Sequence, residues 1–175
     1  PMSDGAAITD LLAPALLLCG AMQRCAMEEG LRIGPDGSGS IRTRVTIPKD
    51  FGSDGVAGAR RELEKRGFRV VEEGTSGADR FTVVERSFVN VSDLNADDQS
   101  YNLILDRPNW FRAAYTFTHT LKGNPAANGF TCKFRAILPA AVTHTSHGTA
   151  AGNTVEWNCG TGGTLTVSGE GFVLP

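Results

Sequence analysis

The segment from Arg135 to Val167 constrains the fold most, because it reads as short strands joined by tight turns. One strand ends at Leu138-Pro139, and a short polar strand runs up to a turn at Gly152-Asn153. The next strand carries Trp157, an aromatic residue typical of a core, and a glycine-rich turn leads into a last strand. Several short strands separated by turn residues at this spacing predict an antiparallel, β-rich domain.

The rest of the chain shows similar alternation around a single helical segment. Within residues 40–47, the apolar side chain of Ile41 is followed by the basic Arg42, and this period of two residues predicts a half-buried strand. The segment 53–66 instead has apolar residues at helical spacing and is followed by Gly67, a natural C-cap. The pattern predicts an α+β fold, a mostly antiparallel β-sheet or β-sandwich-like domain with one main covering helix at about 53–66. Further strands are predicted at 29–33, 68–72, 80–88, 101–105, 110–121 and 130–138.

The length and the charge of the chain limit its class. The 175 residues are enough for one domain with a real core. We interpret them as an apolar tail at 1–24 followed by a single β-rich domain at 25–175. The 19 acidic and 17 basic residues nearly balance, whereas a nucleic-acid-binding domain usually carries a basic stripe. We therefore expect no nucleic-acid partner.

The tail contains a short apolar run that ends near two cysteines. The run is too short to span a bilayer, which takes about 20 apolar residues, and no Lys or Arg precedes it. Three interpretations remain open: a segment that leads to a lipid-anchored cysteine, a short helix docked on the domain or on a partner, and a remnant of a signal peptide. An exposed apolar run marks a membrane or partner site. The predicted docking residues are Leu11, Leu12, Leu16, Leu17 and Leu18.

The four cysteines suggest two kinds of covalent link. Cys25 is the candidate lipid anchor, although neither Cys25 nor Cys19 follows the small residues expected at a lipoprotein cleavage site. Cys132 and Cys159 lie on predicted neighbouring hairpin strands, and we expect a disulfide bond between them, which requires an oxidising compartment. The alternative is two free, buried thiols, because free cysteine packs like a small hydrophobic residue.

No residues are predicted to be catalytic, to bind a cofactor or to hold a metal ion. His144 and His147 would point to opposite faces of an extended strand. His119 stands alone on an apolar strand face, where a half-buried, hydrogen-bonded histidine is expected. No G-x-S-x-G motif is present. The basic residues of the first half, including Arg42 and Arg44, could face anionic lipid headgroups, but a solvated surface diluted by glutamates is the favoured interpretation.

Three segments, in order, resemble the LppM-like domain of bacterial lipoproteins over about residues 25–170. They are GLRIGPDGSGSIRTRVTIP (30–48), LEKRGFRV (63–70) and FRAILPAAVTHTSHGTAAGNTVEW (134–157). The resemblance implies an extracytoplasmic, membrane-associated domain of one sheet and one main helix. It also implies binding of a lipid or a partner rather than catalysis.

The leading hypothesis is a noncatalytic accessory or structural protein in the periplasm or at the cell surface. Its tail would hold it at a membrane or at a membrane-embedded complex, for example as a subunit of a respiratory or photosynthetic complex. The alternative is a carrier or binding module for a lipid-like ligand enclosed between helix and sheet. A hydrolase is a weaker third possibility. None of these hypotheses requires a cofactor.

Overall fold

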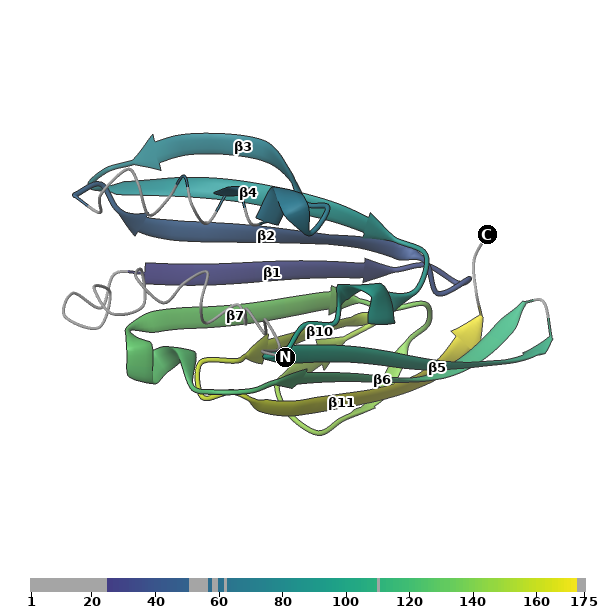
Figure 1. The fold of residues 1–175 in the computed structure, drawn as a ribbon. Helices are drawn as coiled ribbons and strands as arrows, with labels where there is room; N and C mark the ends of the chain where they lie inside the picture. The colour runs from purple at the N-terminus through teal and green to yellow at the C-terminus, as the bar shows by residue number, and fades with distance from the viewer. Residues whose placement is uncertain (1–24, 51–56, 58–59, 62, 110, 173–175) are drawn as a thin grey trace, which may run out of the picture.

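Two β-sheets form the body of the domain (Figure 1). A computed structural model describes residues 25–50, 57, 60–61, 63–109 and 111–172. In this part of the chain, a seven-stranded sheet has the order β3-β4-β2-β1-β7-β10-β9, and a four-stranded sheet has the order β5-β6-β11-β8. The strands are β1 (Cys25–Ile33), β2 (Gly39–Pro48), β3 (Arg69–Ser76), β4 (Asp79–Phe88), β5 (Gln99–Asn109), β6 (Arg112–Leu121), β7 (Phe130–Ile137), β8 (Val142–Thr145), β9 (Thr149–Ala151), β10 (Thr154–Asn158) and β11 (Gly163–Phe172). Two short 3₁₀ turns are η1 (Val91–Leu94) and η2 (Pro125–Asn128).

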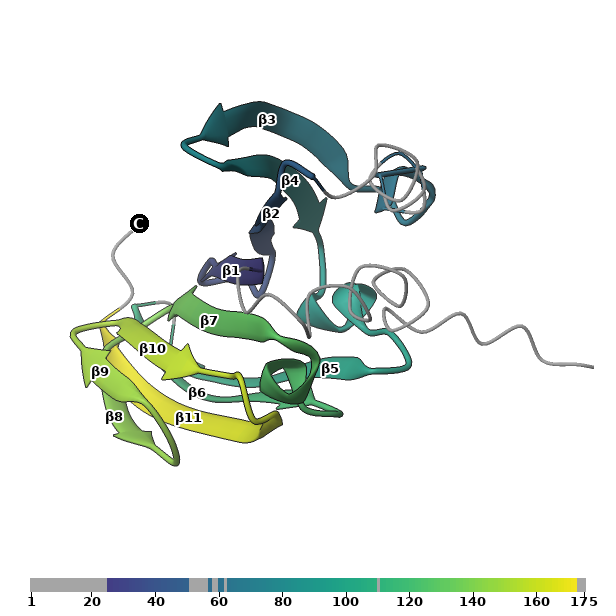
Figure 2. The same cartoon turned by 90° about the vertical axis from the view of Figure 1, so that its left-hand side faces the viewer.

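The larger sheet bends, so that only part of it packs on the smaller one. Strands β7 and β10 lie over β6 and β11, whereas β2, β3 and β4 stand away from the smaller sheet (Figure 2). The hairpin of β8 and β9 contributes one strand to each sheet. The domain is therefore a sandwich with a projecting three-stranded wing, formed by β2, β3 and β4.

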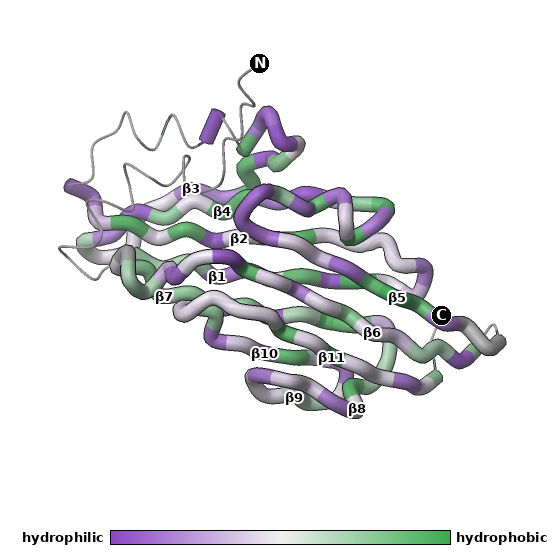
Figure 3. Tube along the Cα trace, turned by 60° about the horizontal axis from the view of Figure 1, so that its bottom comes forward, coloured by the Kyte–Doolittle hydropathy of each residue, from purple (hydrophilic) through white to green (hydrophobic). Residues whose placement is uncertain are grey.

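Alternation of apolar and polar residues builds the core between the sheets, as expected for strands with one buried face. Figure 3 shows apolar and polar segments alternating along the tube. In β7, every second side chain is buried, from Phe130 through Phe134 to Ala136. Strand β6 alternates in the same way, with Phe117 completely buried. The largest fully buried apolar side chains are Phe117, Phe134, Leu31, Ile41, Leu138, Leu165, Val155 and Val167.

One strand pair departs from the expected antiparallel pattern. Strands β1 and β7 pair in parallel, with Cys25 opposite Phe130 and Arg32 opposite Ile137. Antiparallel strands can be joined by a two-residue turn, but parallel neighbours need a long crossover connection. Here the whole segment from β2 to β6 lies between them. Because no short turn joins the two strands, the sequence contains no local signal for this pairing, and the sequence pattern did not predict it.

The predicted α+β class is wrong, because the described residues form two β-sheets rather than one sheet under a main helix. Part of the expected helix at 53–66 lies outside the described residues. Within it, residues 57, 60–61 and 63–65 are helical and lead directly into β3. The helical pattern of this segment therefore corresponds to a short helical stretch within a β fold. It does not correspond to a helix that covers a sheet. Among the residues described, no helix has the length and apolar character needed to cross a bilayer.

Trp157 occupies the core position that its alternation with Val155 and Cys159 predicts. It is 7% exposed, and its ring meets that of His119 edge-on at 5.8 Å between centroids. We expect Trp157→Ala to lower the free energy of unfolding by about 3–5 kcal/mol, because a large buried aromatic would be replaced by a cavity. Urea denaturation measures the change. The control Val89→Ala, at a position 74% exposed, should change it by less than about 0.5 kcal/mol. Equal stability of the two variants would contradict the core assignment.

Candidate functional site

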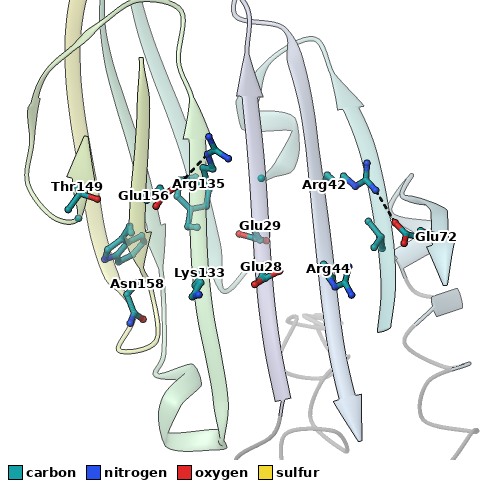
Figure 4. A pocket seen from close by; sticks show the side chains of 15 residues that line it. Glu28, Glu29, Arg42, Arg44, Glu72, Lys133, Arg135, Thr149, Glu156 and Asn158 are labelled. Atoms are coloured by element: carbon teal, nitrogen blue, oxygen red, sulfur yellow. Dashed lines mark hydrogen bonds and ion pairs between the residues drawn. The ribbon is translucent and has the colours of Figure 1, made fainter. Parts of the chain in front are cut away.

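A charged groove crosses the face of the larger sheet that points away from the smaller sheet (Figure 4). Its volume is about 760 Å³. The bend of the larger sheet makes this face concave (Figure 2), and strands from both the wing and the sandwich line it. The cationic side chains of the lining are Arg42, Arg44, Lys133 and Arg135.

Strand alternation and register place these side chains together. Gly30 in β1 lies opposite Arg42 in β2 and opposite Arg135 in β7. In the neighbouring row, Glu28 lies opposite Arg44 and opposite Lys133. Residues in register on adjacent strands share a face. Each row therefore has a β1 residue in the middle and one cationic side chain on each side of it.

The two arginines beside Gly30 form ion pairs that lead away from the centre of the groove. Arg42 Nη2 lies 3.3 Å from Glu72 Oε2, and Arg135 Nε lies 3.5 Å from Glu156 Oε1. All four side chains are roughly half exposed or more, since the most buried of them, Glu72, is 49% exposed. Exposed pairs of this kind contribute little to stability, about 0–1 kcal/mol.

A buried polar cluster lies on the other face of β1, directly beneath the groove floor. Glu29 is 8% exposed, and its Oε2 lies 3.4 Å from the hydroxyl of Tyr101. The same hydroxyl lies 3.2 Å from Gln99 Oε1. Burial raises the pKa of Glu29 to about 7; the hydrogen bond from Tyr101 and the charge of Arg66 oppose this rise, and the charge of Asp98 adds to it.

His119 extends this cluster into the aromatic core. Its ring stacks on Tyr101 with centroids 4.3 Å apart, and it lies 4.6 Å from the ring of Phe134. Nδ1 donates to the carbonyl of Ser100 at 3.3 Å in one tautomer, which leaves the buried Nε2 without a hydrogen-bond partner within the described structure. Burial lowers the pKa of His119 to about 4, against the effect of the Ser100 bond. The expectation of a half-buried, satisfied histidine is therefore wrong.

The structure confirms one of the two predictions made for the cysteines and disagrees with the other. Cys132 and Cys159 form a disulfide bond with Cα atoms 5.0 Å apart, as the hairpin placement predicts. Cys25 is buried at the start of β1, and its sulfur is also in a disulfide bond. The prediction of Cys25 as a lipid anchor does not agree with this structure, because a sulfur in a disulfide bond has no free thiol to carry a lipid.

The other predicted residues do not gather into a site. The docking residues Leu11, Leu12, Leu16, Leu17 and Leu18 lie outside the described residues. His144 lies in β8, and His147 lies in the turn that follows it. Across the ranges that the structure describes, no group of three His, Cys, Asp or Glu side chains could hold a metal ion.

Sequence reasoning missed most of the groove. It considered Arg42 and Arg44 as a possible surface for anionic headgroups and favoured a solvated surface instead. The sequence did indicate that Lys133 and Arg135 lie on the exposed face of β7, because they alternate with the buried Cys132, Phe134 and Ala136. Nothing local relates that strand to Gly30, since the two are joined only by the parallel pairing.

The fold is similar to a known one. No protein-family model and no curated protein matches the chain. Among solved structures, the NMR structure of the folded domain of Mycobacterium tuberculosis LppM matches over 87% of this chain and 92% of that domain. The TM-score is 0.52 and the sequence identity is 16%. The two domains share a fold, and the resemblance to an LppM-like domain is confirmed at that level.

The raised pKa of Glu29 predicts how its replacement changes stability with pH. A carboxyl group whose pKa in the folded state lies above its ordinary value of 4.5 stabilises the fold fully below pH 4.5, and this stabilisation is lost as the pH rises through about 7. Glu29→Gln keeps the shape and stays neutral. We expect the variant to gain about 3 kcal/mol relative to the natural chain between pH 4.5 and pH 8, measured by urea denaturation at each pH.

Subtracting the stability of the natural chain from that of Glu29→Gln separates the effect of Glu29 from that of His119. The lowered pKa of His119 makes the fold less stable at low pH, whereas the raised pKa of Glu29 makes it less stable at high pH. His119 stabilises the fold fully above pH 6.5, and this stabilisation is lost as the pH falls through about 4. Both chains share that loss, so it cancels in the difference. Glu28→Gln is the matched control, because Glu28 is the exposed neighbour on the same strand. A pH-independent difference for Glu29→Gln would refute the buried-acid assignment.

Proposed function

We propose that this domain is a noncatalytic, extracytoplasmic binding module that acts at a membrane surface and uses the charged groove as its binding face. The observation that carries the proposal is a concave groove of about 760 Å³ on a domain whose two sheets enclose a filled core. The disulfide bond between Cys132 and Cys159 supports an oxidising, extracytoplasmic compartment. The fold shared with the LppM domain is consistent with this assignment.

A lipid carrier that encloses its ligand is less well supported than a surface binder. Aromatic and aliphatic side chains of the described core pack into one cluster between the sheets. The groove is open and carries four cationic side chains on its lining, Arg42, Arg44, Lys133 and Arg135, which suit an anionic group of a ligand. A lipid would therefore be bound through its headgroup.

Hydrolysis has little support in the arrangement of polar residues. Ser146 Oγ lies 3.0 Å from His147 Nδ1 in an exposed turn, and it also accepts a hydrogen bond from the Thr166 amide at 2.9 Å. A Ser-His-Asp triad needs a buried carboxylate to orient the histidine. The hydrogen bonds that the structure describes at His147 involve Thr145 and Ser146 and no carboxylate. This geometry gives no support to a triad at Ser146 and His147, and the proposal remains a noncatalytic one.

A second candidate is a subunit of a larger membrane complex, of which respiratory and photosynthetic complexes are examples. The observation that favours it is the apolar run Leu11–Leu18, since an apolar run of this kind marks a partner or membrane site. In this role the tail, rather than the groove, would make the principal contact.

Membrane fractionation of the full chain tests the membrane assignment. We expect the natural chain to sediment with membranes, and a variant with Leu11, Leu12, Leu16, Leu17 and Leu18 changed to Ser to be retained less. Each buried leucine is worth about 1.5–3 kcal/mol relative to exposure, so loss of five should remove the tail's share of the retention. Val89→Ser is the control, because Val89 is an exposed apolar residue outside the tail. Unchanged retention of the five-serine variant would refute anchoring by the tail.

The compartment is tested by the redox state of the cysteines. We expect protein isolated without reductant to yield a linked peptide pair containing Cys132 and Cys159 in nonreducing mass spectrometry. A cytosolic protein would show free thiols instead, because cytosolic reductants keep cysteines reduced. Freshly isolated protein in which both thiols can be alkylated would contradict the extracytoplasmic assignment.

A further inference from the structure

Gly30 leaves a hollow in the middle of the groove floor. It is an exposed residue in the centre of β1, and the groove lies directly over it. A Cβ atom built at this position would meet only the carbonyl oxygen of Arg42, at 3.8 Å. Every larger residue would project into the groove, so glycine is the residue that lets a ligand approach the backbone here.

Two guanidinium groups flank this hollow. Arg42 and Arg135 each lie opposite Gly30 on its two neighbouring strands, so their Cα atoms are separated by two strand spacings, or roughly 10 Å. Arginine side chains at this separation can converge on one group between them. The guanidinium fork matches the oxygens of a phosphate or a carboxylate in a bidentate arrangement.

The present partners of these arginines would not prevent their turning inward. Glu72 and Glu156 hold the guanidinium groups from the flanks of the groove through half-exposed contacts, and such contacts contribute little. Arg44 and Lys133 add positive charge in the neighbouring row, on either side of Glu28. The four cations outnumber the three outward-facing glutamates of the lining, Glu28, Glu72 and Glu156.

We propose that the hollow over Gly30, between Arg42 and Arg135, is a subsite for a phosphate group. The proposal rests on the proposed function, since it names the chemistry of the ligand that the groove binds. The phosphate can belong to a lipid headgroup or to a soluble phosphate ester, because both present the same oxygens. Arg42 and Arg135 exchange their flanking glutamates for the phosphate oxygens, and the rest of the ligand extends along the groove.

The test measures binding of inorganic phosphate by calorimetry, and binding of phosphatidylglycerol–phosphatidylcholine vesicles by sedimentation, with the full chain at low salt. Arg42→Gln and Arg135→Gln should each weaken phosphate binding at least about tenfold, the effect of losing a charge-assisted hydrogen bond. Arg69→Gln is the matched control. It removes a positive charge from the same sheet at an exposed position outside the groove lining, and it should change affinity by less than about twofold.

Gly30→Val tests whether phosphate binding needs the space over Gly30, because this variant fills the hollow without removing a positive charge. The variant retains every cation, fills the hollow and places a β-branched residue in a strand, where it is well tolerated. Gly30 is not among the glycines with positive φ, so no backbone strain opposes the change. We expect the thermal midpoint to be equal or higher and phosphate binding to be lost. A Gly30→Val chain that melts normally and binds phosphate like the natural chain would overturn the subsite.

The two probes distinguish the source of the phosphate. Loss of inorganic phosphate binding together with weaker vesicle binding in the three groove variants supports a subsite that accepts lipid headgroups; unchanged vesicle binding in these variants assigns the vesicle contact to the tail and overturns a lipid headgroup as the source of the phosphate. Loss of phosphate binding in a chain that never binds vesicles supports a soluble phosphate ester. If the natural chain binds neither probe, the subsite is wrong. The proposed function fails separately, when the natural chain does not sediment with membranes.

Discussion

The parallel pairing of β1 with β7 is the contact on which the rest of the structure depends. It joins residues 25–32 to residues 130–137 and so unites the wing with the sandwich. One face of this pair carries Leu31 and Phe134 into the core. The other face carries Gly30 and Arg135 into the groove. Because side chains alternate along a strand, a single set of backbone hydrogen bonds determines both the interior and the groove.

The bend beside this pairing also explains the polar groups that the core contains. The wing diverges from the smaller sheet at β1, and here the described core includes Glu29, Gln99, Tyr101 and His119. A buried polar group is costly unless it is hydrogen-bonded, and Tyr101 reduces this cost by bonding to its neighbours. Raising the pKa of Glu29 and lowering that of His119 favours the neutral form of each group. The junction therefore contains hydrogen-bonded polar groups and two titratable side chains, Glu29 and His119, whose charged forms are disfavoured by burial.

This arrangement places the stabilising core and the groove on opposite faces of the same strands. The apolar side chains and the disulfide bond between Cys132 and Cys159 hold the sandwich. The groove uses the opposite face of the same strands, where side chains are exposed and weakly paired. Such side chains can change partners without disturbing the core, because the backbone that carries them is fixed by strand pairing.

The sequence by itself determined the position of most strands and, where apolar and polar residues alternate regularly, the face on which a side chain lies. It missed the full length of β1 and β5 and the division of one predicted polar strand into β8 and β9. Alternation in 40–47 and 130–137, the turn residues and the position of Trp157 are local signals, and they agree with the structure. Cys132 and Cys159 could be paired because they lie on strands close together in the chain. Only the tertiary structure decided the division into two sheets, the parallel partner of β1, the disulfide-bonded state of Cys25 and the meeting of Arg42 with Arg135 around Gly30. A period of two residues shows that a strand has one buried face. It does not show which other strand pairs with it, because many strands have the same alternation. The choice among them depends on packing between segments about a hundred residues apart, which no local pattern encodes.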